Sequence, residues 1–355
     1  MRSVKIRFEG FWPNFVPEDF FLTKILQKYY DVQICQDADY VICSLFDYYA
    51  YIDSPQIRIF FSGENYVPDF NFVDYGISVY PLEFGDRHFS FPGLVLTSYD
   101  FLEEVEQKNR NYSSDILNEK PYFANLIVGH ESEGNIRGDM LRLLSEYKRV
   151  ESAGYYLNNM PGKETVNMRD GTKLALQRKC KFTLCGESIA HEGFITEKIF
   201  DAFLADTIPI YYGSATISQI VNKNAYIDIR DFENLEAVVE KIIELDQDDE
   251  AYMQMLRQPI FLDEKFVQKR IHDLERFILN IFEQPYELAY RRAKRYLPVK
   301  YANHIRLGKK LENRPYRVAC RNIWSWVNKS IVIAYWNAFE WLVKMKRRFI
   351  SSKSQ

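Results

Sequence analysis

Apolar and polar positions along the first hundred residues follow a pattern that predicts strands separated by helices. The strand-like runs are rich in β-branched and aromatic residues, are bounded by Asp, Pro and Gly, and span residues 4–9, 30–35, 38–45 and 57–63. Residues 18–30 instead space their apolar side chains as a helix does. This order predicts a parallel sheet with both faces covered.

A second series of strands and helices begins near Tyr122. Apolar runs of strand length occupy residues 122–129, 150–157, 181–187, 207–213 and 225–232. Amphipathic runs of helical length occupy residues 135–148, 172–179, 196–206 and 233–247. Their alternation predicts a second α/β unit of the Rossmann type.

Polar and charged residues between the two series mark a linker at 98–120. The sequence therefore predicts an α/β protein of two Rossmann-like domains facing a cleft, followed by a basic, aromatic-rich helical C-terminal tail. We place the three parts at residues 1–115, 116–288 and 289–355. No repeat of fixed period is visible.

Charge is distributed unevenly along the chain. The formal net charge is −3, yet residues 291–355 carry 17 Lys and Arg against the two acids Glu312 and Glu340. Residues 1–290 are therefore strongly acidic, which argues against a polyanion as their partner. The basic tail is instead expected to meet an anionic surface.

The cysteines and the amino-terminal residues both indicate the cellular compartment of the protein. The five cysteines are odd in number and scattered, mostly within apolar runs: Cys35, Cys43, Cys180, Cys185 and Cys320. This pattern predicts reduced core thiols of a cytosolic protein, and the lack of a second close pair argues against a zinc site. The opening residues MRSVKIRFEGFWPNF contain no apolar stretch of a secretory signal, so we expect a cytoplasmic location.

The predicted helix at 196–206 opens with a cation where the helix dipole disfavours one. Thr196 has the residue type of an N-cap, which puts Glu197 and Lys198 in the first turn. The cation there costs a few tenths of a kcal/mol to about 1 kcal/mol. A bound anion would reverse the sign, because backbone N–H groups, the dipole and Lys198 would converge on it. Alternatively, Lys198 is solvated or pairs with Asp201 one turn on.

Glu197 also has two interpretations. An acidic residue at this edge of a Rossmann unit can accept hydrogen bonds from both hydroxyls of a ribose. A glutamate in the first turn of a helix is also favoured by the dipole alone. The pattern of residues does not choose between these interpretations.

Three stretches resemble the signature of one enzyme family, in the order that the family has them. Residues 181–214, KFTLCGESIAHEGFITEKIFDAFLADTIPIYYGS, are similar to the signature strand, Thr-Glu-Lys and Ile-Pro-Ile-Tyr elements of the α-1,3/4-fucosyltransferases. Residues 60–89 resemble the acceptor-side Gly-Glu-Asn segment of bacterial members, and residues 125–159 match a third, weaker element. The chain is therefore identified as a member of this family.

The resemblance implies an inverting glycosyltransferase of the two-Rossmann, or GT-B, type that uses GDP-fucose and needs no bound metal. Residues 1–115 would form the acceptor-side domain and 116–288 the nucleotide-sugar domain. Carried over by position, Glu64 would be the general base, and the donor-binding residues would be Arg137, Glu187, Phe194, Glu197 and Lys198.

These residue types suit the implied chemistry. Substitution at a sugar carbon passes through an oxocarbenium-like state, so it needs a base on the acceptor hydroxyl and positive charge on the departing diphosphate. Glu64 would supply the base, and Lys198 with the planar fork of Arg137 would supply the charge. Glu197 would bind the ribose hydroxyls. Thr196, Gly193 and Gly213 are expected to be structural, as a cap and two close-approach turns.

The chain departs from the family pattern around the expected donor pocket. Gly186 and Ser188 stand where the family usually has Phe and Asn, and Phe194 stands where many members have Tyr. His130 lies near the family's Ser-Asn position. Glu187 is retained, and it would make either a donor contact or a structural hydrogen bond. These changes leave open a rival function in which the same fold uses a different nucleotide sugar.

A metal-dependent alternative rests on Asp37 and Asp39. The Asp-X-Asp form can hold a divalent ion on a diphosphate, but here it precedes a short strand far in sequence from the nucleotide motif. We therefore expect no cofactor and no metal.

The tail favours docking to a membrane surface. Its apolar segment contains Trp324, Trp326, Trp336 and Trp341 but is interrupted by polar and charged residues, so an interfacial helix on anionic lipid fits better than a span. The aromatic residues are separate from the basic run, which argues against nucleic acid.

Together, these features predict a peripheral enzyme on the inner face of the cell membrane. It would move L-fucose from GDP-fucose to a GlcNAc/Gal-type glycan during synthesis of cell-surface polysaccharide such as lipopolysaccharide. A catalytically inert glycan-binding scaffold, anchored by the tail, is the alternative from another class.

Overall fold

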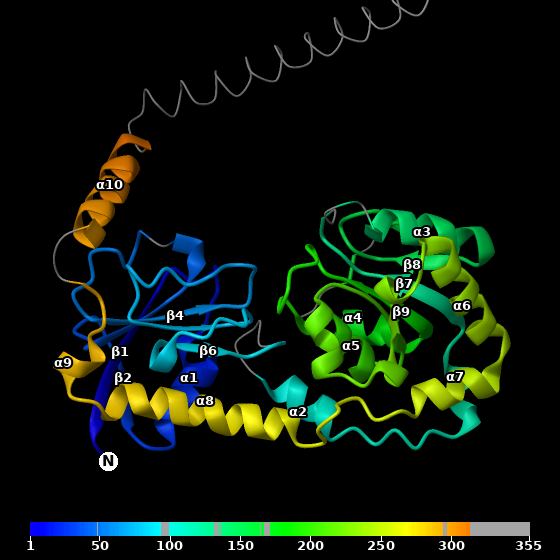
Figure 1. The fold of residues 1–355 in the computed structure, drawn as a ribbon, viewed down its shortest axis with the longest axis horizontal. Coiled ribbons are helices and arrows are strands. Elements are labelled where there is room, and N and C mark those ends of the chain that lie inside the picture. The colour runs from blue at the N-terminus through cyan, green and yellow to red at the C-terminus, as the bar shows by residue number, and fades with distance from the viewer. Residues whose placement is uncertain are drawn as a thin grey trace, which may run out of the picture. The chain divides into compact units, whose positions relative to one another are not determined.

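The computed structural model describes residues 1–47, 49–93, 99–130, 134, 136–163, 165–166, 171–293 and 297–312. The chain divides into two compact units, Met1–Arg292 and Ala293–Gln355. The first unit holds two parallel β-sheets with their helices (Figure 1). This confirms the predicted α/β fold with two Rossmann-like sheets.

Six parallel strands form the first sheet, in the order β2-β1-β3-β4-β5-β6. Their bounds are β1 (Ser3–Glu9), β2 (Asp31–Ile34), β3 (Tyr40–Cys43), β4 (Ile57–Ser62), β5 (Tyr75–Ser78) and β6 (His88–Ser90). Every residue of β3, β4 and β5 is buried, as expected where helices and loops cover both faces of a parallel sheet. The four predicted strands are confirmed as β1 to β4, whereas β5 and β6 were not predicted.

Five parallel strands form the second sheet, in the order β11-β10-β9-β7-β8. Their bounds are β7 (Tyr122–Leu126), β8 (Val150–Ser152), β9 (Cys180–Gly186), β10 (Ile208–Tyr212) and β11 (Ile227–Asp228). The accompanying helices are α3 (Ile136–Tyr147), α4 (Thr172–Arg178), α5 (Glu197–Leu204), α6 (Leu235–Gln247) and α7 (Asp249–Leu256). The predicted strands and helices of this series are all confirmed, and α7 is additional.

The predicted linker contains a packed helix. α2 (Asp100–Glu106) buries Leu102 and Val105, which are three residues apart, and it contacts α5 and α8 (Phe266–Glu283). Two apolar residues in a charged stretch give too weak a periodic signal to predict a helix. They are nevertheless enough to stabilise the helix once a neighbouring surface buries them.

α8 returns the chain to the first sheet. We expected residues up to 288 to go with the second domain, but α8 contacts α1 (Phe21–Gln27) and α2 (Figure 1). After α8, the short helix α9 (Tyr286–Ala289) leads to Arg292, whose Nε lies 2.9 Å from the buried Asp74 Oδ2. Asp74 Oδ1 also accepts the backbone N–H groups of Arg291 and Arg292.

The second unit contains α10 (Leu297–Glu312). The predicted tryptophan-rich segment that begins at Trp324 lies outside the described residues, as does Cys320. Within the part of the chain that is described, no helix combines the length and apolar character that crossing a bilayer requires. Cys43, Cys180 and Cys185 are free and buried, as predicted for core thiols.

Candidate active site

The predicted site residues lie where strands end at the carboxyl edges of the two sheets. Glu64 follows β4 of the first sheet, and Gly186 closes β9 of the second. Because helices of a βαβ unit begin at this same edge, Arg137 at the start of α3 and Lys198 at the start of α5 belong to it as well.

Glu64, Arg137 and Lys198 line a cavity of about 980 Å³. Its lining includes five of the six predicted positions: Glu64, Arg137, Phe194, Glu197 and Lys198. The structure thus brings residues from both sheets around one space large enough for a nucleotide sugar. Glu187 does not contribute to the lining.

Glu187 is a fully buried anchor behind the cavity wall. Its Oε1 accepts hydrogen bonds from the backbone N–H and the hydroxyl of Thr196, both at 2.8 Å. Its Oε2 lies 2.9 Å from Lys198 Nζ. We expected Glu187 as a donor contact or as a structural hydrogen-bonding residue, and the structure shows the structural bonds. Its carboxylate fixes the loop that enters α5.

Thr196 occupies the N-cap position of α5 but does not cap it through its side chain. Its backbone is extended there, as at an N-cap, while its hydroxyl makes no hydrogen bond to the helix N–H groups. The hydroxyl instead lies 2.8 Å from both Glu187 carboxylate oxygens and 2.8 Å from Lys198 Nζ. The expected capping bond was wrong because a buried carboxylate competes for the same hydroxyl.

Lys198 is held by acids rather than by solvent or by Asp201. Besides Glu187, its Nζ lies 3.7 Å from Glu197 Oε1, and the side chain is 23% exposed. Burial opposes its charge, but Glu197 and Glu187 outweigh burial and raise the pKa of Lys198. The ammonium group is therefore charged at neutral pH, fixed in place, and part of the cavity lining.

Lys173 is a third cation of the site, beside Arg137 and Lys198, and the sequence pattern did not predict it. It is the second residue of α4, is only 5% exposed, and lines the cavity. Its Nζ lies 2.6 Å from Asp201 Oδ2 and 4.0 Å from Glu197 Oε1. A usable signal was present, because a lysine in the first turn of the helix predicted at 172–179 belongs to the same sheet edge as Lys198.

Glu197 therefore lies between two lysines. Burial raises the pKa of its carboxyl, but Lys198 and Lys173 more than offset this, so the net pKa is lowered. A carboxylate kept ionised in this way can only accept hydrogen bonds. That is the property required for binding the two hydroxyls of a ribose.

Replacing Lys173 with methionine is expected to destabilise the fold at neutral pH. Asp201 and Glu197 would lose a cation in a buried place, which usually costs about 3–5 kcal/mol. We expect roughly 2 kcal/mol, because burial already raises the pKa of Asp201 and lets it take up a proton.

The unfolding free energy from urea titration checks this expectation. The deficit of Lys173→Met should shrink as the pH falls from about 7 to about 5, because protonated carboxyls no longer need the cation. The exposed Lys179→Met variant at the other end of α4 is the control. An unchanged unfolding midpoint at pH 7 would contradict the buried ion pair.

Arg137 uses its guanidinium to hold the end of β9. Its Nε and Nη2 donate to the carbonyl oxygen of Gly186 at 3.0 and 2.8 Å, and Nη1 donates to the carbonyl of His130 at 2.9 Å. Gly186 allows this approach, since a Cβ there would lie 3.1 Å from Arg137 Cγ. The residue that departs from the family pattern thus makes room for the predicted phosphate clamp.

The two glycines expected at close approaches are confirmed. Gly193 has a φ of 75°, and a Cβ at this position would lie 2.1 Å from Pro81 of the first sheet's loops. At Gly213 a Cβ would lie 2.4 Å from the Tyr211 hydroxyl and 2.8 Å from Glu187 Cγ. Phe194, next to Gly193, is 2% exposed and contributes a nonpolar edge to the cavity.

Glu64 is exposed and lies at the carboxyl edge of the first sheet. Its backbone N–H donates to Ser62 Oγ at 3.0 Å, and its carbonyl accepts the N–H of Tyr66 at 2.6 Å. These bonds fix the backbone of the turn while the carboxylate lines the cavity. A carboxylate in this position can accept a proton from a bound hydroxyl group.

The Asp-X-Asp candidate does not line this cavity. Asp37 is fully exposed and pairs with Lys5 Nζ at 3.2 Å. Over the described ranges, no cluster of three or more His, Cys, Asp or Glu residues has an arrangement that would hold a metal ion.

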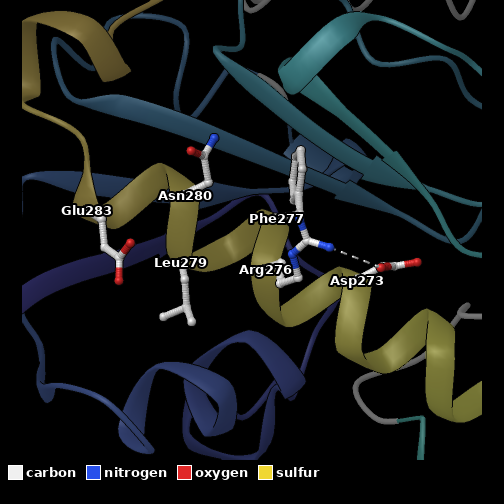
Figure 2. Close-up of a pocket in the computed structure, with 6 residues that line it drawn as sticks. All are labelled: Asp273, Arg276, Phe277, Leu279, Asn280 and Glu283. Carbon is white, nitrogen blue, oxygen red and sulfur yellow. Dashed lines mark ion pairs between the residues drawn. The ribbon is translucent and has the colours of Figure 1, made fainter.

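A second hollow of about 560 Å³ lies along α8 (Figure 2). All of its lining residues belong to this one helix: Asp273, Arg276, Phe277, Leu279, Asn280 and Glu283. Two of these residues, Arg276 and Asp273, form an ion pair within the helix, with 4.0 Å between Nη1 and Oδ1. None of the predicted site residues is in it, so the 980 Å³ cavity remains the candidate active site.

Solved structures share this fold. A crystal structure of an α1,3-fucosyltransferase with GDP-fucose matches 81% of this chain and 93% of its own with a TM-score of 0.63 and 23% identity. A second structure of an α1,3-fucosyltransferase matches 83% of this chain and 93% of its own, with a TM-score of 0.65 and 22% identity. The fold is therefore that of a GT-B glycosyltransferase.

Two family models match consecutive parts of the chain. Residues 6–97 match the alpha-(1,3)-fucosyltransferase FucT N-terminal domain, and residues 117–263 match the C-terminal part of glycosyltransferase family 10 (fucosyltransferase). The chain belongs to this fucosyltransferase family.

Curated relatives agree with this assignment. Alpha-(1,3)-fucosyltransferase FucT of Helicobacter pylori is 28% identical over 220 residues, which cover 56% of this chain and 46% of the relative. Alpha-(1,3)-fucosyltransferase B of Drosophila melanogaster is 29% identical over 123 residues, which cover 33% of this chain and 28% of the relative. The chain thus spans less than half of the length of these relatives.

Proposed function

We propose that this protein is an inverting α-1,3-fucosyltransferase that uses GDP-fucose and a GlcNAc/Gal-type glycan acceptor. One observation carries the proposal: a carboxylate from the first sheet, Glu64, and cations from the second sheet, Lys198 among them, line the same cavity. Transfer from a sugar diphosphate needs both, on opposite sides of the reacting carbon. Membership in the fucosyltransferase family supports fucose as the sugar.

In the proposed reaction, Glu64 removes the proton of the acceptor hydroxyl as its oxygen attacks the anomeric carbon of fucose. The bond between that carbon and the diphosphate oxygen breaks, and its electron pair leaves with GDP. Attack on the face opposite the leaving group inverts the anomeric configuration.

The second sheet would bind the donor. Lys198, fixed by Glu187 and Thr196, would neutralise the diphosphate as its charge grows, and Glu197 would bind the ribose. Arg137 would contribute a positive potential to the diphosphate site, while its guanidinium donates hydrogen bonds to the carbonyls of Gly186 and His130. No residue in this scheme calls for a metal.

The basic tail would hold the enzyme at the inner face of the cell membrane, where cell-surface polysaccharide is assembled. This part of the proposal rests on the 17 Lys and Arg residues of 291–355 and on the tail's tryptophans.

A donor panel tests the function. Purified full-length protein is incubated with GDP-fucose, GDP-mannose or UDP-sugars and a lactosamine-type acceptor, with and without chelator, and the product is analysed by mass spectrometry and NMR. We expect one fucose per acceptor in α-1,3 linkage, at equal rates with chelator. Transfer only from another sugar nucleotide would overturn the fucose assignment, and binding without transfer would favour the scaffold alternative.

A different donor sugar is the second candidate function. The observation that favours it is Gly186, since Arg137 rather than an aromatic ring occupies the space beside it. The same donor panel decides between the two.

A further inference from the structure

An aromatic loop forms the cavity wall on the side of the first sheet. It connects β1 to α1 and contributes Trp12, Asn14, Phe15 and Asp19 to the cavity lining. Neither the proton transfer nor the donor binding proposed above uses any of these residues. They nevertheless share the cavity with Glu64.

Trp12 is held in one orientation by three other rings. Its ring centroid lies 5.6 Å from Phe11, 5.2 Å from Phe15 and 5.6 Å from Phe46, and all three contacts are edge-on. Such aromatic contacts are worth about 0.5–1.5 kcal/mol each beyond burial, as judged from protein pairs. Trp12 is only half-buried, so this fixed indole leaves part of its surface to the cavity.

Asn14 has a backbone conformation that most residues avoid. Its φ is 63°, in the left-handed region, where asparagine is among the few non-glycine residues that are tolerated. Strained backbone of this kind concentrates at ligand sites. The turn presents an exposed amide, with both a donor and an acceptor, next to Trp12 in the cavity lining.

The charges on the two sides of the cavity differ. The lining residues from the first sheet include the acids Asp19 and Glu64 and, over the described part of the chain, no lysine or arginine. The lining residues from the second sheet include the cations Arg137, Lys173 and Lys198 beside one acid, Glu197. A diphosphate is therefore attracted to the second side, and the first side suits a neutral ligand.

An aromatic face beside short polar side chains is suited to a sugar ring. The negative face of the indole attracts the C–H groups on the less polar face of a pyranose. An amide can donate hydrogen bonds to the sugar hydroxyls and accept them, and a carboxylate can accept them. Glu64, on the same side, is then positioned to take the proton from one of those hydroxyls.

We propose that Trp12 is the stacking surface for a neutral pyranose of the acceptor, with Asn14 and Asp19 binding its hydroxyls. This rests on the proposed function, because it assigns the acceptor side of the same site. It makes Trp12 and Asn14 specificity-determining residues, and it excludes an acidic sugar from the position next to Glu64.

Acceptor kinetics test the assignment. Trp12→Ala should raise the acceptor KM about tenfold, as expected for loss of one aromatic stacking contact, with the Kd for GDP unchanged. Asn14→Gly should raise the acceptor KM without loss of stability, because glycine accepts a φ of 63° without strain. An acceptor with a carboxylate on the stacked sugar should be a poor substrate for the wild type.

Phe84→Ala is the matched control for Trp12→Ala. Phe84 is an exposed aromatic residue in the loop between β5 and β6, its ring centroid lies 4.7 Å from that of Phe70 at a tilted angle, and it does not line the cavity. An unchanged acceptor KM in both Trp12→Ala and Asn14→Gly, in an active enzyme, would overturn the subsite and leave the proposed function intact.

Tryptophan emission tests binding independently of turnover. Trp12 is the only tryptophan before Trp324, so the difference in emission between the full-length wild type and Trp12→Phe reports on this loop. Adding a neutral lactosamine-type acceptor should change the wild-type emission and leave that of Trp12→Phe nearly constant. An equal response in both proteins would overturn the subsite even if no donor supported transfer.

Discussion

Replacing Glu64 with glutamine is expected to lower kcat by about 10²–10⁴-fold. The amide keeps the size of the side chain and loses the ability to take the acceptor proton. GDP affinity should stay within twofold of the wild type, because Glu64 comes from the first sheet and the cations come from the second. Initial rates with saturating substrates and calorimetric titration with GDP measure the two quantities.

Two further variants show whether the effect belongs to Glu64. Asp19→Asn removes the other acid of the first sheet's cavity lining and should affect the acceptor KM more than kcat. Glu83→Gln changes an exposed acid outside the cavity lining and should have no effect. A large loss of kcat in Asp19→Asn with a normal Glu64→Gln enzyme would assign the base to Asp19.

Replacing Lys198 with methionine is expected to reduce both stability and GDP binding. Glu187 is fully buried and would lose its cation, which costs about 3–5 kcal/mol of unfolding free energy. GDP affinity should also fall about tenfold to a hundredfold, the value of a hydrogen bond to a charged group. Urea titration and calorimetry below the melting transition separate the two losses.

Conservative and partner variants distinguish the two roles of Lys198. Lys198→Arg keeps the charge beside Glu187 and should recover most of the stability. Glu187→Gln removes the buried acid, so it should lower stability while GDP binding stays close to that of the wild type. If Lys198→Met bound GDP normally, the phosphate role would be wrong, whatever its stability.

The stabilisation from this ion cluster should not depend on pH near neutrality. The pKa of Lys198 is raised in the fold, so its contribution is complete below its ordinary value of about 10.5 and is lost only as the pH rises through the folded pKa. The pKa of Glu197 is lowered, so its contribution is present above about 4.5 and is lost as the pH falls through the lower folded value. These two groups should thus add no slope to the unfolding free energy of the wild type between about pH 6 and about pH 9, as measured by urea titration.

Gly186 differs from the residue that the family pattern leads one to expect, and it lies against Arg137 in the site. A side chain at this position would press on Arg137, which holds the Gly186 carbonyl through two nitrogens. The small residue at position 186 and the bound guanidinium therefore belong to one arrangement.

Much of the fold was predictable from the sequence because its signals are local. The apolar runs of β4 and β9 and the amphipathic spacing of α5 are visible within ten residues, and parallel order follows from their alternation. The short strands β5 and β6 and the weakly amphipathic α2 were missed, because distant neighbours rather than their own composition stabilise them.

The sequence by itself determined that Glu197 and Lys198 begin a helix at the carboxyl edge of a parallel sheet, and which family the chain belongs to. Only the tertiary structure decided the partners of these charges: Lys198 pairs with Glu187, and Asp201 pairs with Lys173 from another helix. Trp12 and Glu64 likewise line one cavity only in the folded chain. The reason is that helix and strand periodicity depends on near neighbours, whereas the partner of a buried charge depends on which distant segments exclude water around it.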